Sequence, residues 1–177
     1  MTHLALAKRL VQRARRRGAD QAEAYVEVGR DESCRVRDGE IEDLSQATSK
    51  GVGLRVVSKR RLGFAYTSDF GAASLDAMVD RAVALAKSAA PSPHNDLPRR
   101  TELAPAKARQ DGGDLFDEAV ASLPAEWKIR AALEMEKAAR GVDKRITAFE
   151  SVGAGQTVSE AFLASSEGFA GQVRGTA

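Results

Sequence analysis

Three side chains in this sequence are of the types that most often do chemistry in proteins: two histidines and a single cysteine. A zinc hydrolase needs three protein ligands, an open fourth position and a carboxylate base. His3 and His94 are far apart, and neither belongs to a His-Glu-x-x-His motif, so we expect both to be ordinary surface residues. Cys34 alternates with Ser33 and Arg35 in a strand-like segment, which favours a packed thiol over a nucleophile.

Glycines and paired carboxylates give no stronger signal. The Gly51–Gly53 segment opens a strand, and no Lys-Ser or Lys-Thr pair follows it as in a phosphate-binding loop. The Gly153–Gly155 segment precedes no helix, and no Gly-x-Ser-x-Gly elbow occurs. Glu134 and Glu136 point in two directions on a helix. The sequence therefore predicts no catalytic, cofactor-binding or metal-ligating residue in this chain.

Basic residues gather near the start of the chain, at Lys8, Arg9, Arg13, Arg15, Arg16 and Arg17. Such a cluster can indicate nucleic-acid binding. No aromatic residue interleaves it, however, and the formal net charge is only +2. We interpret it as the solvent face and last turn of an amphipathic helix, where cations also suit the helix dipole.

Composition indicates a globular protein, with 43% hydrophobic and 29% charged residues. No apolar run approaches the roughly 20 residues that span a bilayer, and the polar, basic N-terminus does not resemble a signal peptide. One cysteine cannot form an internal disulfide. We expect a cytoplasmic protein that does not associate with membranes.

Residues 1–90 read as a helix, a β-meander and a second helix. The first helix is expected over Thr2–Arg17, because apolar residues recur at intervals of three and four and Gly18 follows. The period then changes to two, which predicts five short strands. They are expected at Ala22–Val28, Glu32–Arg37, from Glu40, at Val52–Val57 and at Leu62–Tyr66, with turns at Asp38-Gly39, Ser49–Gly51 and Lys59–Arg61. Such tight connections make the strands antiparallel.

The second helix is expected over Leu75–Ala89, ending before Pro91 and covering one face of the meander. The fold class is therefore α+β. Residues 91–114 hold four of the five prolines and Gly112-Gly113, which indicates a long connection.

Residues 115–177 are expected to contain a third helix and further strands, in the same domain or leading into another one. The helix is expected over Pro124–Arg140, with one shared face: Trp127, Ala131, Met135, Ala138 and Val142. A turn at Ser165–Gly168 follows the later strands, and a last extended segment then begins. We expect that segment to lack a partner, which suggests the front part of a longer protein.

Several segments, in this order and spacing, resemble the N-terminal domain of the TldD/PmbA family. They are Gly18–Glu23, Asp38–Glu42, Ser49–Val56, Gly63–Asp69, the helix at Leu75–Ala89, Asp143–Thr147 and Ser165–Phe169. The segments Asp114–Phe116 and Lys144–Thr147 are closer to the PmbA (TldE) branch than to TldD.

This resemblance implies a paired system. In the family, TldD-type subunits carry a zinc-protease motif, PmbA-type subunits lack it, and the two form a heterodimeric peptidase that acts on unfolded peptides. The metal site lies beyond the part that this chain resembles, so the zinc belongs to a TldD-type partner or to a region outside this segment.

Four alternatives stay open. The chain is the front part of a TldD-like catalytic subunit, or it forms a homo-oligomer. An older family label, modulator of DNA gyrase, together with the basic first helix, keeps a nucleic-acid-binding role as a rival. A stand-alone enzyme that uses Cys34 comes last.

Overall fold

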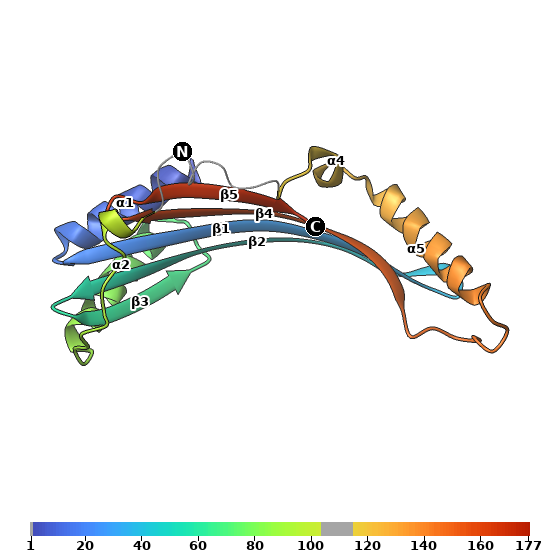
Figure 1. Cartoon of the computed structure of the whole chain (residues 1–177), viewed down its shortest axis with the longest axis horizontal. Coiled ribbons are helices and arrows are strands. Elements are labelled where there is room, and N and C mark those ends of the chain that lie inside the picture. Colours follow the sequence, from blue (N-terminus) through green and yellow to red (C-terminus); the bar gives the residue numbers. More distant parts are fainter. Residues whose placement is uncertain (1, 104–114) are drawn as a thin grey trace. The chain divides into compact units, whose positions relative to one another are not determined.

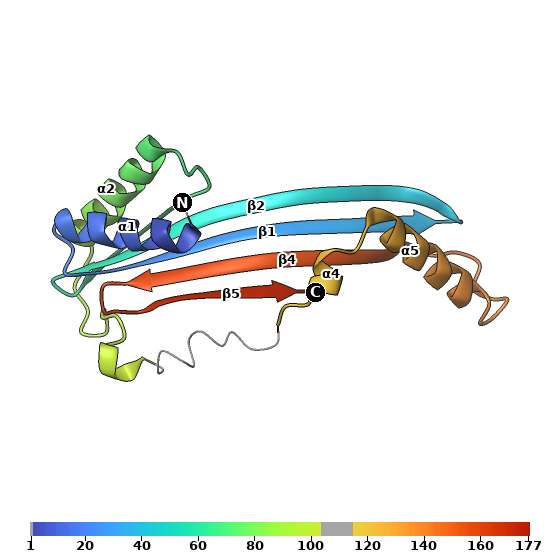
Figure 2. The same ribbon diagram turned by 90° about the horizontal axis from the view of Figure 1, so that it is seen from above.

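The computed structural model describes residues 2–103 and 115–177 (Figure 1). Five strands form one sheet in the order β3-β2-β1-β4-β5, and neighbouring strands run antiparallel (Figure 2). The strands are β1 (Gln21–Arg37), β2 (Glu40–Ser58), β3 (Arg61–Thr67), β4 (Val152–Ser165) and β5 (Ala170–Thr176). The helices are α1 (His3–Arg16), α2 (Ala72–Ser88), the 3-10 turn η1 (Arg100–Glu102), α4 (Glu118–Ala121) and α5 (Ala125–Arg140). The predicted α+β class is confirmed.

The five short strands expected before Tyr66 are in fact the three longer strands β1, β2 and β3. A Cβ atom added at Gly29 would lie 3.1 Å from Ser49 Oγ, so this glycine reflects close packing in the middle of β1 and not the end of a strand. Gly51 does not adopt a positive φ, and β2 continues through it. The turn expected at Ser49–Gly51 is therefore wrong.

The two remaining turns of the meander are confirmed. Asp38 and Gly39 have φ values of 53° and 79°, the left-handed conformation of a two-residue hairpin turn. Lys59 and Arg60 join β2 to β3 with φ values of 50° and 61°. The Lys59 amide donates a 2.6 Å hydrogen bond to Asp20, which holds this turn without glycine.

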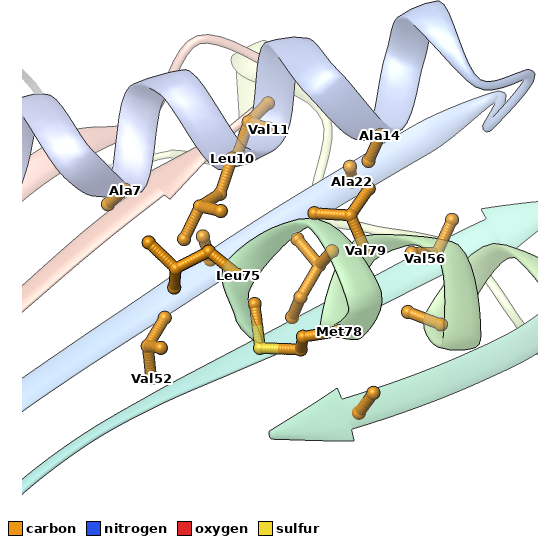
Figure 3. Packing of buried hydrophobic residues seen from close by; sticks show 14 of the residues in the cluster. Ala7, Leu10, Val11, Ala14, Ala22, Val52, Val56, Leu75, Met78 and Val79 are labelled. Atoms are coloured by element: carbon orange, nitrogen blue, oxygen red, sulfur yellow. The ribbon is translucent and has the colours of Figure 1, made fainter. Parts of the chain in front are cut away.

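The described chain divides into two compact units, and β1, β2, β4 and β5 contribute residues to both. The first unit contains residues 2–28, 50–103 and 160–173. Side chains from α1, α2, β1 and β2 converge in its core (Figure 3). The apolar stripe predicted for α1 lies there, with Leu10 and Ala14 fully enclosed, and Thr2 caps the helix by accepting a hydrogen bond from the Ala5 amide. The prediction for α2 is also confirmed.

Gly63 sets how closely α2 approaches β3. A Cβ atom at this position would lie 2.1 Å from the Ala82 carbonyl oxygen and 2.5 Å from the Ala86 nitrogen. Only glycine allows this contact between the strand and the helix backbone. The residues that alternate with Gly63, namely Leu62, Phe64 and Tyr66, are exposed.

The second unit contains residues 29–49, 115–159 and 174–177. Its small apolar cluster is formed by Cys34, Val36 and Ala132, with Ile129 and Leu133 of α5 packed against it. Pro124 precedes α5 and Gly141 follows it, as predicted. The four-residue helix α4 was not predicted from the sequence.

The described part of the Pro-rich connection, residues 91–103, includes η1 and the buried side chain of Leu97. Pro105 and Gly112-Gly113 lie outside the described residues. The turn at Ser165–Gly168 is confirmed, with a φ of 91° at Gly168. The last segment is not unpaired as expected, because β5 lies beside β4 in the sheet.

Candidate functional site

The residues considered first for chemistry occupy three separate environments. Cys34 is fully enclosed, and burial, followed by the nearby Asp43 carboxylate, raises the pKa of its thiol. The packed thiol is therefore confirmed. His3 is partly exposed, and its ring lies 5.3 Å from the Phe162 ring and 6.0 Å from the Phe70 ring, in edge-to-face contacts. His94 is exposed, as predicted.

These donors do not fit a zinc site. The thiol lies in an apolar cluster, and the His3 imidazole packs against two phenyl rings. Within residues 2–103 and 115–177, no group of three or more His, Cys, Asp or Glu side chains is arranged to hold a metal ion.

The buried face of α5 carries two charged side chains, Lys128 and Glu136, beside the apolar Ala132, which the sequence did not reveal. Lys128 is enclosed, and its ammonium group lies 2.8 Å from a Glu32 carboxylate oxygen. The ammonium group also donates to Gln156 Oε1 at 2.7 Å and to the Leu123 carbonyl at 3.0 Å. The hydrogen bond from Lys128 is the main reason that the pKa of Glu32 is lowered. All three donor positions of the lysine are thus satisfied.

Glu136 lies two turns further along α5 and binds the turn between β1 and β2. Its two carboxylate oxygens accept hydrogen bonds from the amides of Asp38 (2.9 Å) and Gly39 (3.0 Å). Arg140 donates to Glu136 and also pairs with the Asp38 carboxylate. The hydrogen bond from Arg140, followed by that from Gly39, lowers the pKa of Glu136.

Most of the apolar face predicted for α5 lies outside the buried face of the helix. Trp127, Met135 and Val142 are 39%, 44% and 78% exposed, whereas Lys128, Ala132 and Glu136 are buried. The buried face is therefore offset from the shared apolar face by one residue along the helix, about 100° of rotation. We call Trp127, Ala131, Met135, Ala138 and Val142 the α5 stripe.

A second exposed surface lies on β3 in the first unit. Phe64 and Tyr66 are 53% and 78% exposed, and their rings stack with centroids 6.3 Å apart. Phe64 lies across Gly53 of β2, whose missing side chain leaves room for the ring. β3 ends the strand order, and no further strand within the described part of the chain pairs with Leu62–Thr67 on its outer side. Backbone groups at such an edge can accept an added strand.

A hollow of about 250 Å³ lies beside this edge, where β3 meets α2. Its lining combines apolar and polar side chains: Tyr66, Thr67, Ser74, Ala77, Met78 and Arg81. Ser74 is held by a hydrogen bond from its hydroxyl to Asp69. Strand edge and hollow together offer backbone pairing and a place for a side chain, the two elements of strand-addition recognition.

Comparison with known proteins identifies the family. The model for the PmbA/TldA metallopeptidase domain 1 matches residues 22–86, and the model for the PmbA/TldA metallopeptidase central domain matches residues 118–177. The chain belongs to the PmbA/TldD family. The two matches together cover more than half of its length, and the resemblance found in the sequence is confirmed.

Individual relatives agree with this assignment. A stretch of 59 residues, 33% of the chain, is 41% identical to a metalloprotease TldD homolog of Haemophilus influenzae. TldE from Thermococcus kodakarensis shares the fold over 96% of the chain, with a TM-score of 0.75 and 18% identity. A protein from Bacteroides thetaiotaomicron, described as a "putative modulator of DNA gyrase", matches 97% of the chain with a TM-score of 0.76 and 25% identity.

The chain spans only part of the length of these relatives. It covers 36% and 38% of the two solved structures, and the matched stretch is 12% of the Haemophilus protein. No helix in the described residues has the length and apolar character needed to cross a bilayer.

Proposed function

We propose that this chain is the non-catalytic N-terminal part of a PmbA/TldE-like subunit in a cytoplasmic zinc peptidase that acts on unfolded peptides. A TldD-type partner subunit supplies the zinc. Membership of a metallopeptidase family supports the enzyme class. The likeness of Lys144–Thr147 to the PmbA branch supports the choice of subunit.

The observation that carries this proposal is the outer edge of β3 with its adjoining hollow. A peptide that joins the sheet there forms backbone hydrogen bonds that do not depend on its sequence. Phe64 and Tyr66 add exposed aromatic surface next to that edge. Unfolded chains have free backbone groups, so such a surface selects them over folded proteins.

The α5 stripe is the surface that we propose for contact with the partner subunit. Trp and Met are enriched where protein interfaces are most buried. The stripe carries both, and Lys128 and Glu136 anchor the helix from a different face, about 100° of rotation away. A partner can therefore cover the stripe without competing for the contacts that hold α5 in place.

The proposal is tested by mixing the full-length protein with a TldD-type partner and measuring cleavage of an unstructured peptide. We expect a stable complex and cleavage that stops when zinc is removed. Each protein alone should cleave the peptide more slowly than the mixture does. Absence of both complex and zinc-dependent cleavage would contradict the proposal.

Matched variants separate the two surfaces. Replacing Phe64 and Tyr66 with serine should raise KM at least about fivefold and leave kcat nearly unchanged, because this surface binds peptide without touching the reacting atoms. Trp127→Ser should weaken binding of the partner subunit. With enough partner present to saturate the protein, the KM for the peptide should be unchanged. Leu85→Ser removes a similarly exposed apolar side chain, 46% exposed on α2, and should change neither quantity.

A second candidate is that the full protein is itself a TldD-like catalytic subunit. The 41% identity to a TldD homolog favours it. Zinc analysis of the purified full-length protein separates the two: about one zinc per chain, with peptide cleavage in the absence of a partner, indicates the TldD-like subunit.

A further inference from the structure

A second hollow, of about 600 Å³, lies in the first unit between the outer side of α1 and the turn that joins β4 to β5. Three cationic side chains of α1 line it: Lys8, Arg15 and Arg16. The strand side supplies Ser165, Ser166, Gly168, Phe169 and Ala170. Its volume falls within the roughly 300–1,000 Å³ of ligand pockets.

The basic cluster of α1 divides into two sets with different roles. Arg13 and Arg17 each form an ion pair with Asp76 on α2, at 3.0 and 3.2 Å. Arg17 also pairs with Asp80 at 3.1 Å, so two carboxylates of α2 balance these two arginines within the fold. Lys8 and Arg16 form no ion pair with any residue that the structure describes.

Arg15, the third cation, likewise forms no ion pair with a residue in the described ranges. Arg15 donates a 2.8 Å hydrogen bond to the Ala19 carbonyl, which orients its guanidinium group without cancelling the charge. The nearest acidic residue in the strand turn, Glu167, accepts a hydrogen bond from Ser166 and does not line the hollow. Positive charge therefore accumulates on one side of the hollow.

Apolar surface forms the remainder of the lining. Val11 and Ala164 are buried at its base, and Phe169 and Ala170 lie on the strand side. A ligand that fills this hollow therefore has an anionic part and an apolar part close together. An acidic peptide segment that carries an aliphatic or aromatic residue combines the two.

We propose that this hollow binds an acidic segment of an unfolded peptide, with carboxylates on Lys8 and Arg16 and an apolar side chain against Val11. The inference rests on the proposed function, since it defines which peptides the protein prefers. A nucleic acid fits the site less well. Single strands are held by a charged groove with several aromatic platforms, whereas among the described residues that line this hollow Phe169 alone is aromatic.

Fluorescence anisotropy of a labelled, unstructured peptide of repeating Glu-Glu-Leu, with the full-length protein, tests the proposal. Lys8→Gln combined with Arg16→Gln should weaken binding roughly tenfold, because two charge-assisted contacts are lost. Arg9→Gln is the matched control: it removes an exposed cation from the same helix outside the hollow, and should change binding less than about twofold. If Arg9→Gln weakens peptide binding as much as the double change at Lys8 and Arg16, the proposal is wrong.

Three further probes identify the ligand. A Lys-Lys-Leu peptide should not bind, and a Glu-Glu-Ser peptide should bind several-fold more weakly than Glu-Glu-Leu. A single-stranded oligothymidine that binds as tightly as the acidic peptide, and loses affinity in the Lys8 and Arg16 variant, would overturn the proposal in favour of nucleic acid. The assay needs no partner subunit, so it can fail while zinc-dependent cleavage persists, and the reverse.

Discussion

The ammonium group of Lys128 lies 2.8 Å from the carboxylate of Glu32, and only 1% of the lysine side chain is exposed. A charge in such a position is stable only while its partners remain, because removal of one partner leaves the other without compensation. The pair joins α5 to β1 within the second unit.

Lys128→Met should therefore destabilise the protein although methionine is apolar and similar in length. Glu32 would lose its cation, and Gln156 would lose the donor at its Oε1 atom. We expect a loss of roughly 3 kcal/mol in the free energy of unfolding, measured by chemical denaturation. Lys137→Met, on an exposed position of the same helix, should change stability by less than about 0.5 kcal/mol.

Gly63→Ala should be strongly destabilising, because the new methyl group would collide with the α2 backbone at Ala82 and Ala86. Backbone atoms cannot move aside as a flexible side chain can, so we expect a cost of roughly 2–3 kcal/mol. Gly51→Ala is the control, because nothing lies within 4 Å of a Cβ atom there and its φ is not positive. A similar melting temperature for the two variants would contradict this account.

The stability of the second unit should fall in acid, and Glu136 should contribute to that fall. Its pKa in the folded protein lies below the ordinary value of 4.5, so the unfolded chain binds more protons between these two values. The contribution of Glu136 is complete above pH 4.5 and is lost as the pH falls through the folded-state pKa. Glu136→Gln should therefore flatten the dependence of melting temperature on pH below 4.5, and the exposed Glu134→Gln should not.

Cys34 should react slowly with thiol reagents in the folded protein and rapidly after unfolding. The thiol is enclosed and its pKa is raised, and both effects lower the amount of accessible thiolate. Cys34→Ala should leave peptide cleavage by the assembled enzyme intact. Loss of cleavage at unchanged stability would support the alternative in which this thiol is catalytic.

The spacing of apolar residues and the turn dipeptides correctly predicted those helices and turns that depend on residues close together in the sequence. Leu10 and Ala14 fall on a helical stripe that the core does enclose, and Asp38-Gly39 forms the turn that this dipeptide favours. The turn expected at Ser49–Gly51 made the predicted number of strands too high, because β2 continues through Gly51. Glycine marks either a turn or a close approach, and sequence spacing does not distinguish the two.

The burial of α5 could not be predicted from apolar periodicity. Lys128 and Glu136 are buried because Glu32, Gln156 and the amides of the β1–β2 turn bind them, and these groups are distant in sequence. The two hollows are likewise assembled from separate segments. The Lys8 cluster was visible in the sequence, but the ion pairs that divide it were not.

The contact between Glu136 and the Asp38 amide joins positions 98 residues apart. Glu136 binds the hairpin of β1 and β2, whose turn has only two residues. Formation of this hairpin therefore requires little loss of chain entropy. Docking of α5 requires the closure of a much larger loop. We therefore expect the β1–β2 hairpin to form early during folding. The contact between Glu136 of α5 and the hairpin turn should form late, after most of the chain has collapsed.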